Sequence, residues 1–422
     1  MHSRSLFVFA VCLLSSAAAS AQQDPVPPAA ESTFPGFMGQ SGAFTTRFDN
    51  AFNPAMAVVF DAVATASESD AGELNDARLR LFEIDLASRI DPLGWAYAVI
   101  AFEDDGEEGE VALEEGAMWL DDALPGNFSL RGGKFLADFG KWNTIHLHDR
   151  AYVFMPGPAE EFLGGELNVS GLELHHWFGA GDLPVRWSVG VAPRFGGHEH
   201  GHEEEDAGGA EGHAETPFAS EALGRRTPSQ FLYTARVSAQ HDVGVNGFFQ
   251  WGVSTIHTPA GLAAPADLDL DGEADAELEA GQTTLALDLT LRLPDPATRT
   301  AHTASLELYA NRRDAWDDAA AALAEREANG AWGYYEYAFS PSWSAGVFGS
   351  WNQEAATEAG AEWFTGADAA SARALFTTWT LSHYNRLRLQ IGQESPPGGE
   401  TSWTAALQWT VVLGNHAHPL DW

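Results

Sequence analysis

Residues 79–90, LRLFEIDLASRI, decide the fold because their polarity changes at every second position. One set of alternate positions consists of Arg80, Phe82, Ile84, Leu86, Ser88 and Ile90. The positions between them include Glu83, Asp85 and Arg89. Successive side chains of a β-strand point to opposite faces of the sheet. The pattern therefore predicts a strand with an apolar face and a charged face.

Segments with the same two-residue period recur along the chain. They occupy residues 55–64, 79–90, 95–103, 111–121, 128–136, 166–178, 185–195, 229–241, 244–256, 282–293, 299–311, 332–339, 342–352, 372–384, 385–394 and 401–413. This makes about sixteen predicted strands, and bacterial transmembrane barrels have an even number of strands.

The connections between these segments alternate between short and long. The short ones lie at 91–94, 124–126, 181–184, 242–243, 294–298, 340–341 and near 385. The long ones lie at 65–78, 104–110, 137–165, 196–228, 257–281, 312–331, 353–371 and 395–400. Short turns on one rim and long loops on the other are typical of a transmembrane β-barrel. A soluble β-sandwich has no reason to sort its loops in this way.

The predicted fold is therefore all-β: a closed transmembrane antiparallel β-barrel of about sixteen strands within residues 51–422. Phe82, Ile84 and Leu86 should face lipid, and Glu83 and Asp85 should face the interior. The chain has no run of 18 apolar residues, so no helical membrane span is expected. No fixed sequence period appears, which disfavours a repeat solenoid.

The N-terminal residues have the layout of a secretory signal peptide. Arg4 precedes the apolar stretch 5–14, and the small residues 19–21 form a cleavage site. Cleavage after Ala21 would leave 422 − 21 = 401 residues, with 22–50 as a periplasmic leader. Cys12 is the single cysteine and lies in the signal peptide, so the mature chain would have no thiol. We expect export to the outer membrane of a Gram-negative-type cell.

The composition is strongly acidic. The chain has 60 Asp and Glu against 22 Lys and Arg, a formal net charge of −38, which becomes −39 without Arg4. Nucleic acid is excluded as a partner, because phosphate backbones require clustered basic residues. A negatively charged protein attracts cations instead.

The middle of the chain contains the motifs Leu130-Arg131-Gly132-Gly133-Lys134-Phe135, Asp138-Phe139-Gly140-Lys141, Asp149-Arg150 with Phe154 and Pro156, and Phe162-Leu163-Gly164-Gly165-Glu166. Together these motifs resemble the phosphate-selective porins and their porin-like relatives. The resemblance covers about a tenth of the chain. It implies a sixteen-stranded barrel whose third long loop, 137–165, folds inward, and it allows a homotrimer. Phosphate selectivity is not carried over, because that group lines its pore with Arg and Lys.

The inward loop would form the pore constriction. Its candidate residues are Lys141, His146, His148, Asp149 and Arg150. His146 and His148 could contact a metal or a permeating cation. Alternatively, Asp149 and Arg150 hold these histidines in ordinary hydrogen bonds within the loop.

A histidine-rich tract lies in the loop 196–228. Its candidate metal ligands are His198, His200, His202, His213, Glu199 and Glu203. Neutral imidazole suits zinc, nickel and copper, and carboxylates add charge. The spacing matches no closed structural zinc site, so the alternatives are a labile zinc or nickel sponge and an ordinary solvated loop.

The loop 257–281 resembles the opening of a calcium-binding loop. Asp267, Asp269, Asp271 and Asp275 accompany a glycine at 272. The twelfth position should hold a bidentate acid but holds Leu278. Calcium binding and a solvated acidic loop both remain open.

The alanine-rich residues 314–329 predict a short helix within a loop, capped by Asp314.

A passive channel is the leading functional interpretation. It would pass small solutes, prefer cations and be linked to divalent metal uptake, zinc above all, with lipid as its surroundings and no required cofactor. One alternative is a non-conducting barrel that captures metal for an active outer-membrane transporter. The other is a barrel enzyme, which is disfavoured because the sequence has no G-x-S-x-G, P-loop or H-E-x-x-H motif. No catalytic residues are therefore predicted.

Overall fold

The computed structural model describes most of the chain. The described residues are 54–69, 72–91, 93–104, 109–181, 183–198, 226–266, 268, 276–317, 320–353, 369–382, 384–396, 399 and 401–414. The predicted signal peptide and leader lie outside them and stay predictions.

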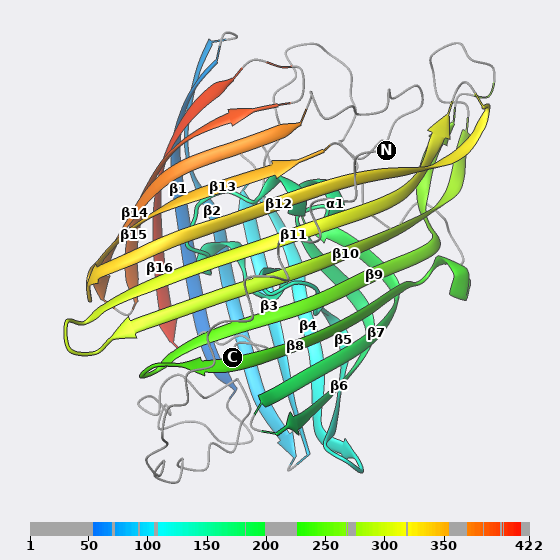
Figure 1. Ribbon diagram of the computed structural model, residues 1–422, viewed down its shortest axis with the longest axis horizontal. Coiled ribbons are helices and arrows are strands. Elements are labelled where there is room, and N and C mark those ends of the chain that lie inside the picture. Colours follow the sequence, from blue (N-terminus) through cyan, green and yellow to red (C-terminus); the bar gives the residue numbers. More distant parts are fainter. Residues whose placement is uncertain are drawn as a thin grey trace.

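Sixteen antiparallel strands form a closed barrel in which each strand pairs with the next and β16 pairs with β1 (Figure 1). The strands are β1 (Ala55–Ser69), β2 (Gly72–Asp91), β3 (Gly94–Asp104), β4 (Gly109–Leu124), β5 (Phe128–Leu136), β6 (Glu166–Ala180), β7 (Leu183–His198), β8 (Leu232–Val243), β9 (Gly247–Ala266), β10 (Ala276–Asp295), β11 (Thr300–Asp317), β12 (Ala322–Ser340), β13 (Trp343–Asn352), β14 (Ala370–Ser382), β15 (Asn385–Ser395) and β16 (Ser402–Gly414). The predicted class and strand number are confirmed.

The turns at one rim are short, as predicted, but several long loops at the other rim are not loops. Within 65–78, strands occupy all but residues 70–71, and within 257–281 they occupy all but 267–275. The alternation weakens there because a strand that extends beyond an apolar belt needs no apolar face. Small and polar residues then continue the strand and look like a loop in the sequence.

The predicted helix at 314–329 is wrong. Residues up to Asp317 belong to β11, those from Ala322 belong to β12, and the two strands stay paired up to Asp317 and Ala322. Alanine favours a helix by less than about 1 kcal/mol per residue over most other residues. The paired backbone of a tall hairpin overrides so small a preference.

Polar side chains face the inside of the barrel, called the lumen here, and apolar side chains face outward. Arg388 and Gln408 are paired across β15 and β16 and are 3% and 1% exposed. Their neighbours Leu389 and Leu407, also paired, are 42% and 47% exposed. Exposed large apolar side chains around the barrel are the reverse of a soluble protein's pattern. Among the described residues, no helix has the length and apolar character needed to cross a membrane.

The segment that decided the fold has the predicted faces except at Arg80. Glu83 is buried inside, whereas Phe82 packs edge-on against the outward rings of Phe60 and Phe102. Arg80 was assigned to the face of Phe82 but is buried in the lumen. The register shifts at Asp61, which leaves Arg80 as the extra residue of a β-bulge and turns it inward.

Residues 137–165 connect β5 to β6, with the bounds that the sequence predicted. They contain two short 3-10 helices, η1 (Trp142–Thr144) and η2 (Leu147–Asp149), and the helix α1 (Gly157–Leu163). In Figure 1 this connection is the turquoise coil with α1, seen between the strands of the barrel. We call residues 137–165 the crossing segment.

One end of the crossing segment is bonded to β9 and β11. The Gly140 N–H donates to Ser254 Oγ (3.0 Å), and the Lys141 N–H donates to Glu307 Oε1 (2.8 Å). Ser254 and Glu307 are both buried in the lumen.

The middle of the crossing segment is bonded to the opposite arc of the barrel. The Val153 N–H donates to Gln390 Oε1 of β15 (2.9 Å), and Arg80 Nη1 of β2 donates to the Val153 carbonyl (2.7 Å). Since β2 and β15 lie far around the ring from β9 and β11, the segment extends across the lumen.

Aromatic rings hold the same segment against a third part of the wall. The Tyr152 ring lies 4.8 Å from Phe348 of β13 and 5.3 Å from Trp332 of β12, measured between ring centres. Phe162 of α1 lies 6.2 Å from Tyr309 of β11. The crossing segment thus packs against aromatic rings of β11, β12 and β13.

A glycine in β5 gives a test of the barrel wall. Gly133 has φ +135° and pairs with Ala117, and a Cβ there would lie 2.3 Å from the Gly116 carbonyl oxygen. We expect Gly133→Ala to lower the free energy of unfolding by about 1–3 kcal/mol, as strained backbone positions do. Urea titration in detergent, followed by tryptophan fluorescence, would measure it.

The matched control is Gly349→Ala in β13, where the nearest heavy atom to an added Cβ is 3.8 Å away. This change should alter stability by no more than about 0.5 kcal/mol. Equal midpoints for the two variants would contradict the close packing of β4 and β5.

Candidate functional site in the barrel interior

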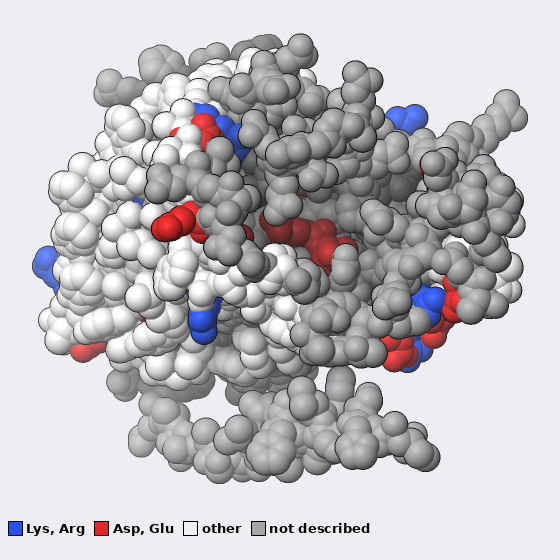
Figure 2. Space-filling view, turned by 90° about the horizontal axis from the view of Figure 1, so that it is seen from above, with Lys and Arg blue, Asp and Glu red and all other residues white. Residues whose placement is uncertain are grey.

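Buried charged side chains of both signs line the lumen. Within the part of the chain that the structure describes, the buried acidic residues are Asp61, Glu83, Glu114, Glu115, Asp138, Glu166, Glu173, Asp288 and Glu307. The buried arginines of the same residues are Arg80, Arg131, Arg150, Arg186, Arg236, Arg313, Arg326 and Arg388. Among buried residues the charges nearly balance, so most of the acidic excess of the chain lies elsewhere. Figure 2 nevertheless shows acidic side chains within the hollow near the centre of one end of the barrel.

Most of these arginines are paired with carboxylates of the wall. Arg236 Nη1 lies 2.6 Å from Asp288, and Arg131 Nη2 lies 2.6 Å from Glu173. Arg80 is similarly bonded to Asp61. Such pairs neutralise these three arginines.

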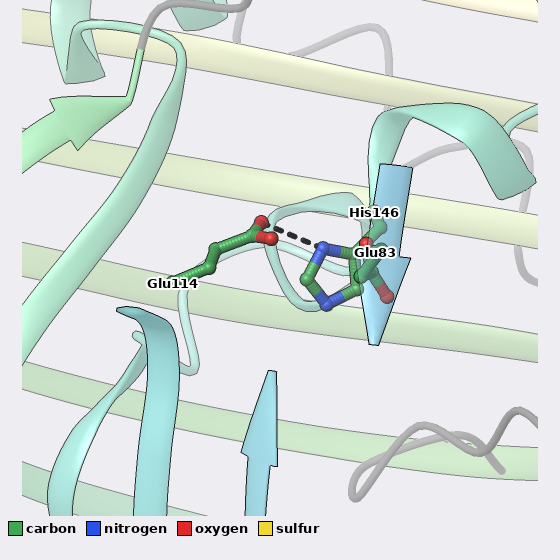
Figure 3. A group of neighbouring side chains, drawn as sticks. All are labelled: Glu83, Glu114 and His146. Carbon is green, nitrogen blue, oxygen red and sulfur yellow. Dashed lines mark ion pairs between the residues drawn. The ribbon is translucent and has the colours of Figure 1, made fainter. Parts of the chain in front are cut away.

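A group of carboxylates surrounds His146 of the crossing segment. His146 Nδ1 lies 2.8 Å from Glu114 Oε1 and 3.9 Å from Glu166 Oε2, and Nε2 lies 3.3 Å from Glu115 Oε1. Glu83 of β2 completes the group, and Figure 3 shows it beside the imidazole with Glu114 pointing toward Nδ1. All these side chains are less than 4% exposed.

A β-bulge explains why neighbouring Glu114 and Glu115 both point inward. In the β3–β4 pairing, Val99 is opposite Glu115 and Ile100 is opposite Leu113, so Glu114 has no partner position. The extra residue bends the strand and redirects its side chain. The sequence showed this acidic pair, but strict alternation would have placed its members on opposite faces.

His146 lies in the crossing segment and not in a strand. The neighbouring carboxylates determine the charge of its imidazole. Burial lowers the pKa of the His146 imidazole, but the carboxylates of Glu114 and Glu83 raise it, and the result is a pKa well above the usual value. Arg150 supplies a further positive charge by pairing with Glu166 at 2.8 Å. The cluster is therefore a strongly negative site that holds positive charge.

A second group, Asp138, Glu173 and His175, lies elsewhere in the lumen. Here arginines already neutralise the carboxylates: Arg131 lies 2.6 Å from Glu173, and Arg186 lies 2.7 Å from Asp138. His175 Nε2 lies 2.6 Å from Glu173 Oε1. This group is a charge-compensated network, and another cation would be repelled by its arginines.

The five predicted constriction residues do not form a single ring. Lys141 Nζ reaches Gln250 of β9 (2.5 Å), on one side of the lumen. His146 and His148 are stacked with ring centres 5.6 Å apart near β2 and β4. Asp149 lies 3.7 Å from Arg386 of β15.

Arg150 has the role of holding the crossing segment together. Its guanidinium donates to the carbonyls of Ile145 (2.9 Å) and Trp142 (3.1 Å) as well as to Glu166. These bonds join Arg150 to the backbone of the segment and to β6, whereas His146 contacts carboxylates of the β4 wall. Contact of His146 and His148 with a cation stays a prediction.

The sequence-predicted metal sites of the outer loops lie outside the described residues. His198 ends β7, and its side chain is not described. The other members are likewise not described, namely His200, His202, His213, Glu199, Glu203, Asp267, Asp269, Asp271 and Asp275. Zinc, nickel and calcium binding there stay predictions.

Comparisons with known proteins support the architecture. No family model matches the chain. An uncharacterized protein of Aquifex aeolicus (strain VF5) is 33% identical over 107 residues, which are 25% of this chain and 22% of that protein. The match thus spans less than a quarter of that relative.

Solved outer-membrane proteins share the fold at low sequence identity. OprB of Pseudomonas putida has a TM-score of 0.51 and 9% identity, with 86% of this chain and 94% of that chain covered. The outer membrane channel DcaP of Acinetobacter baumannii has a TM-score of 0.51 and 9% identity, with 87% and 99% covered. OmpT of Vibrio cholerae has a TM-score of 0.50 and 8% identity, with 85% and 97% covered. At such identities the likeness is one of barrel fold, and the finer resemblance to the phosphate-selective group stays a prediction.

Proposed function

We propose that this protein is an outer-membrane channel for the passive diffusion of small solutes, with a preference for cations, and not an enzyme. The observation that carries the proposal is the reversed polarity of the barrel. Exposed apolar side chains such as Leu375 (67% exposed) suit lipid, and the inward face is polar and charged. A sixteen-stranded ring of this kind leaves room for an aqueous path.

The preference for cations gives a direct test. Four carboxylates lie around His146, and the chain carries 60 acidic residues against 22 basic ones. We expect the protein in planar bilayers to pass cations over anions. The preference should fade from about 0.1 M to about 1 M salt, as the Debye length shrinks from ~10 Å to ~3 Å.

The reversal potential in a salt gradient measures this preference. Preference for anions would refute the proposal. Because buried acidic and basic groups nearly balance, the effect should be traceable to the cluster. Glu114→Gln is therefore expected to reduce the preference more than Glu336→Gln, which changes a half-buried carboxylate bonded to Ser344 of the β13 wall.

A second candidate function is favoured by the bonds of the crossing segment to opposite arcs of the wall. If this segment closed the lumen, the barrel would suit a non-conducting protein that captures metal and delivers it to an active transporter. Absence of conductance for correctly folded protein would support this alternative against the channel.

Three further features belong to the same proposal. Divalent metal, zinc above all, would be gathered by the histidine-rich tract, with calcium at the acidic loop 267–275. Assembly as a homotrimer is consistent with the outward apolar surface, part of which would then be covered by neighbouring barrels. Titration of zinc against the full chain and a chain lacking residues 196–215 tests the first feature, and equal binding would contradict it.

A further inference from the structure

The cluster around His146 has the composition of a metal site. Ligand atoms of Glu83, Glu114 and His146 all lie within 4.8 Å of one another, and the three residues are 0%, 1% and 2% exposed. They come from β2, β4 and the crossing segment, so they lie close together only in the folded barrel.

The dimensions suit a zinc ion. Zinc lies about 2.0–2.2 Å from carboxylate oxygens and about 2.0–2.1 Å from imidazole nitrogens, so its tetrahedral ligands are about 3.4 Å apart. The 2.8 Å between Glu114 Oε1 and His146 Nδ1 needs to widen by only a fraction of an ångström. Calcium, by contrast, takes six to eight oxygen ligands and has no preference for imidazole.

The orientation of the imidazole is the strongest argument. Metal-bound histidines usually donate their other ring N–H to a carboxylate or carbonyl, which fixes the tautomer. Here Nδ1 points to Glu114, and Nε2 lies 3.3 Å from Glu115 Oε1 and can donate to it. Glu115 is itself held, because its Oε2 accepts from the Tyr97 hydroxyl and the Leu136 N–H, each at 3.1 Å.

The group around His175 differs from the group around His146 in the charges beside its carboxylates. Asp138, Glu173 and His175 also lie close together, but Arg131 and Arg186 neutralise their carboxylates. At the first cluster, the positive group beside Glu114 is His146, and His146 becomes a neutral ligand when a metal takes the place of its Nδ1 proton.

We propose that Glu83, Glu114 and His146 bind one Zn²⁺ ion inside the lumen, with Glu115 as the residue that positions the imidazole. Three protein ligands leave the fourth zinc position for water or a passing solute, as in open zinc sites. The inference goes beyond the proposed channel and does not depend on conduction, because binding is measured on protein in detergent.

The test counts zinc on the full chain. Protein is equilibrated with Zn²⁺ by dialysis, and bound metal is measured by mass spectrometry for the unchanged chain, His146→Gln and Glu114→Gln. Each variant should bind one zinc fewer per chain. The matched control is His175→Gln, which changes a buried histidine of the second cluster and should bind as much zinc as the unchanged chain. Any zinc held by the histidine-rich tract contributes equally to all four proteins and cancels in the comparison.

The positioning role of Glu115 has its own readout. In Glu115→Gln the amide oxygen can still accept from Tyr97 and Leu136, but the amide NH₂ then faces His146 Nε2 and favours the wrong tautomer. Zinc affinity should fall about 10- to 100-fold, while the number of zinc ions at saturation stays the same. An unchanged affinity would overturn the positioning role.

Two outcomes overturn the site itself. One is equal zinc content in His146→Gln and the unchanged chain. If His146→Gln and Glu114→Gln fail to fold, crystals of the unchanged chain soaked in Zn²⁺ decide instead. Anomalous density between the three side chains supports the site, and its absence there refutes it. Zinc bound by a barrel that does not conduct would refute the channel and leave this site standing.

Discussion

A chain in which residues 141–163 are replaced by a linker of ten Gly and Ser residues is expected to conduct ions several-fold better than the full chain in planar bilayers. Such a linker reaches about 33 Å when extended. The bonds from this segment to Ser254 and Glu307 on one side and Gln390 on the other show that it extends across the lumen. Its removal leaves polar wall groups that water can solvate.

The comparison requires a folded barrel, which is checked by circular dichroism and by resistance of the unheated protein to SDS. The matched control is Leu375→Ala on the outward face, which should leave conductance unchanged. If the linker variant folds and conducts like the full chain, then the crossing segment does not set the resistance of the pore.

The barrel itself could be predicted from the sequence because its signals are local. Alternation fixes the faces of a strand, as at Phe82 and Glu83. The connection 137–165 has the bounds that the sequence predicted. The tall hairpins were missed for the opposite reason. Beyond an apolar belt the outward face carries no apolar signal, so residues 65–78 resembled a loop.

The candidate site could be predicted only in part, because a β-bulge brings Glu114 into it. His146 was identified from its place in the loop, and Glu83 from alternation. Arg80 and Glu114 point inward because each is the extra residue where the pairing register shifts. A shift of register depends on the partner strand, so no pattern within one strand reveals it.

Arg236 should contribute strongly to the stability of the wall, because it forms a buried ion pair. Its guanidinium donates to both carboxylate oxygens of Asp288, at 2.6 and 3.0 Å, and to Ser254 Oγ at 2.8 Å. Arg236 is 3% exposed and Asp288 is 0% exposed. Arg236→Met leaves a buried carboxylate without its counter-ion, and this should lower the free energy of unfolding by about 3–5 kcal/mol.

Replacing both partners shows how much stability comes from the ion pair and how much from the packing of its side chains. In Arg236→Met with Asp288→Leu neither charge of the pair is left, and the neighbouring Asp138 keeps Arg186 at 2.7 Å. Most of the lost stability should therefore return, since apolar replacement of a whole buried pair is often neutral. Arg312→Met is the matched control: Arg312 lies 2.9 Å from Glu327 with both side chains about 60% exposed, and its loss should cost no more than about 1 kcal/mol. Urea titration with tryptophan fluorescence measures all three. If Arg236→Met costs as little as Arg312→Met, water reaches the Asp288 carboxylate, and this side of the lumen belongs to the aqueous path instead of the packed wall.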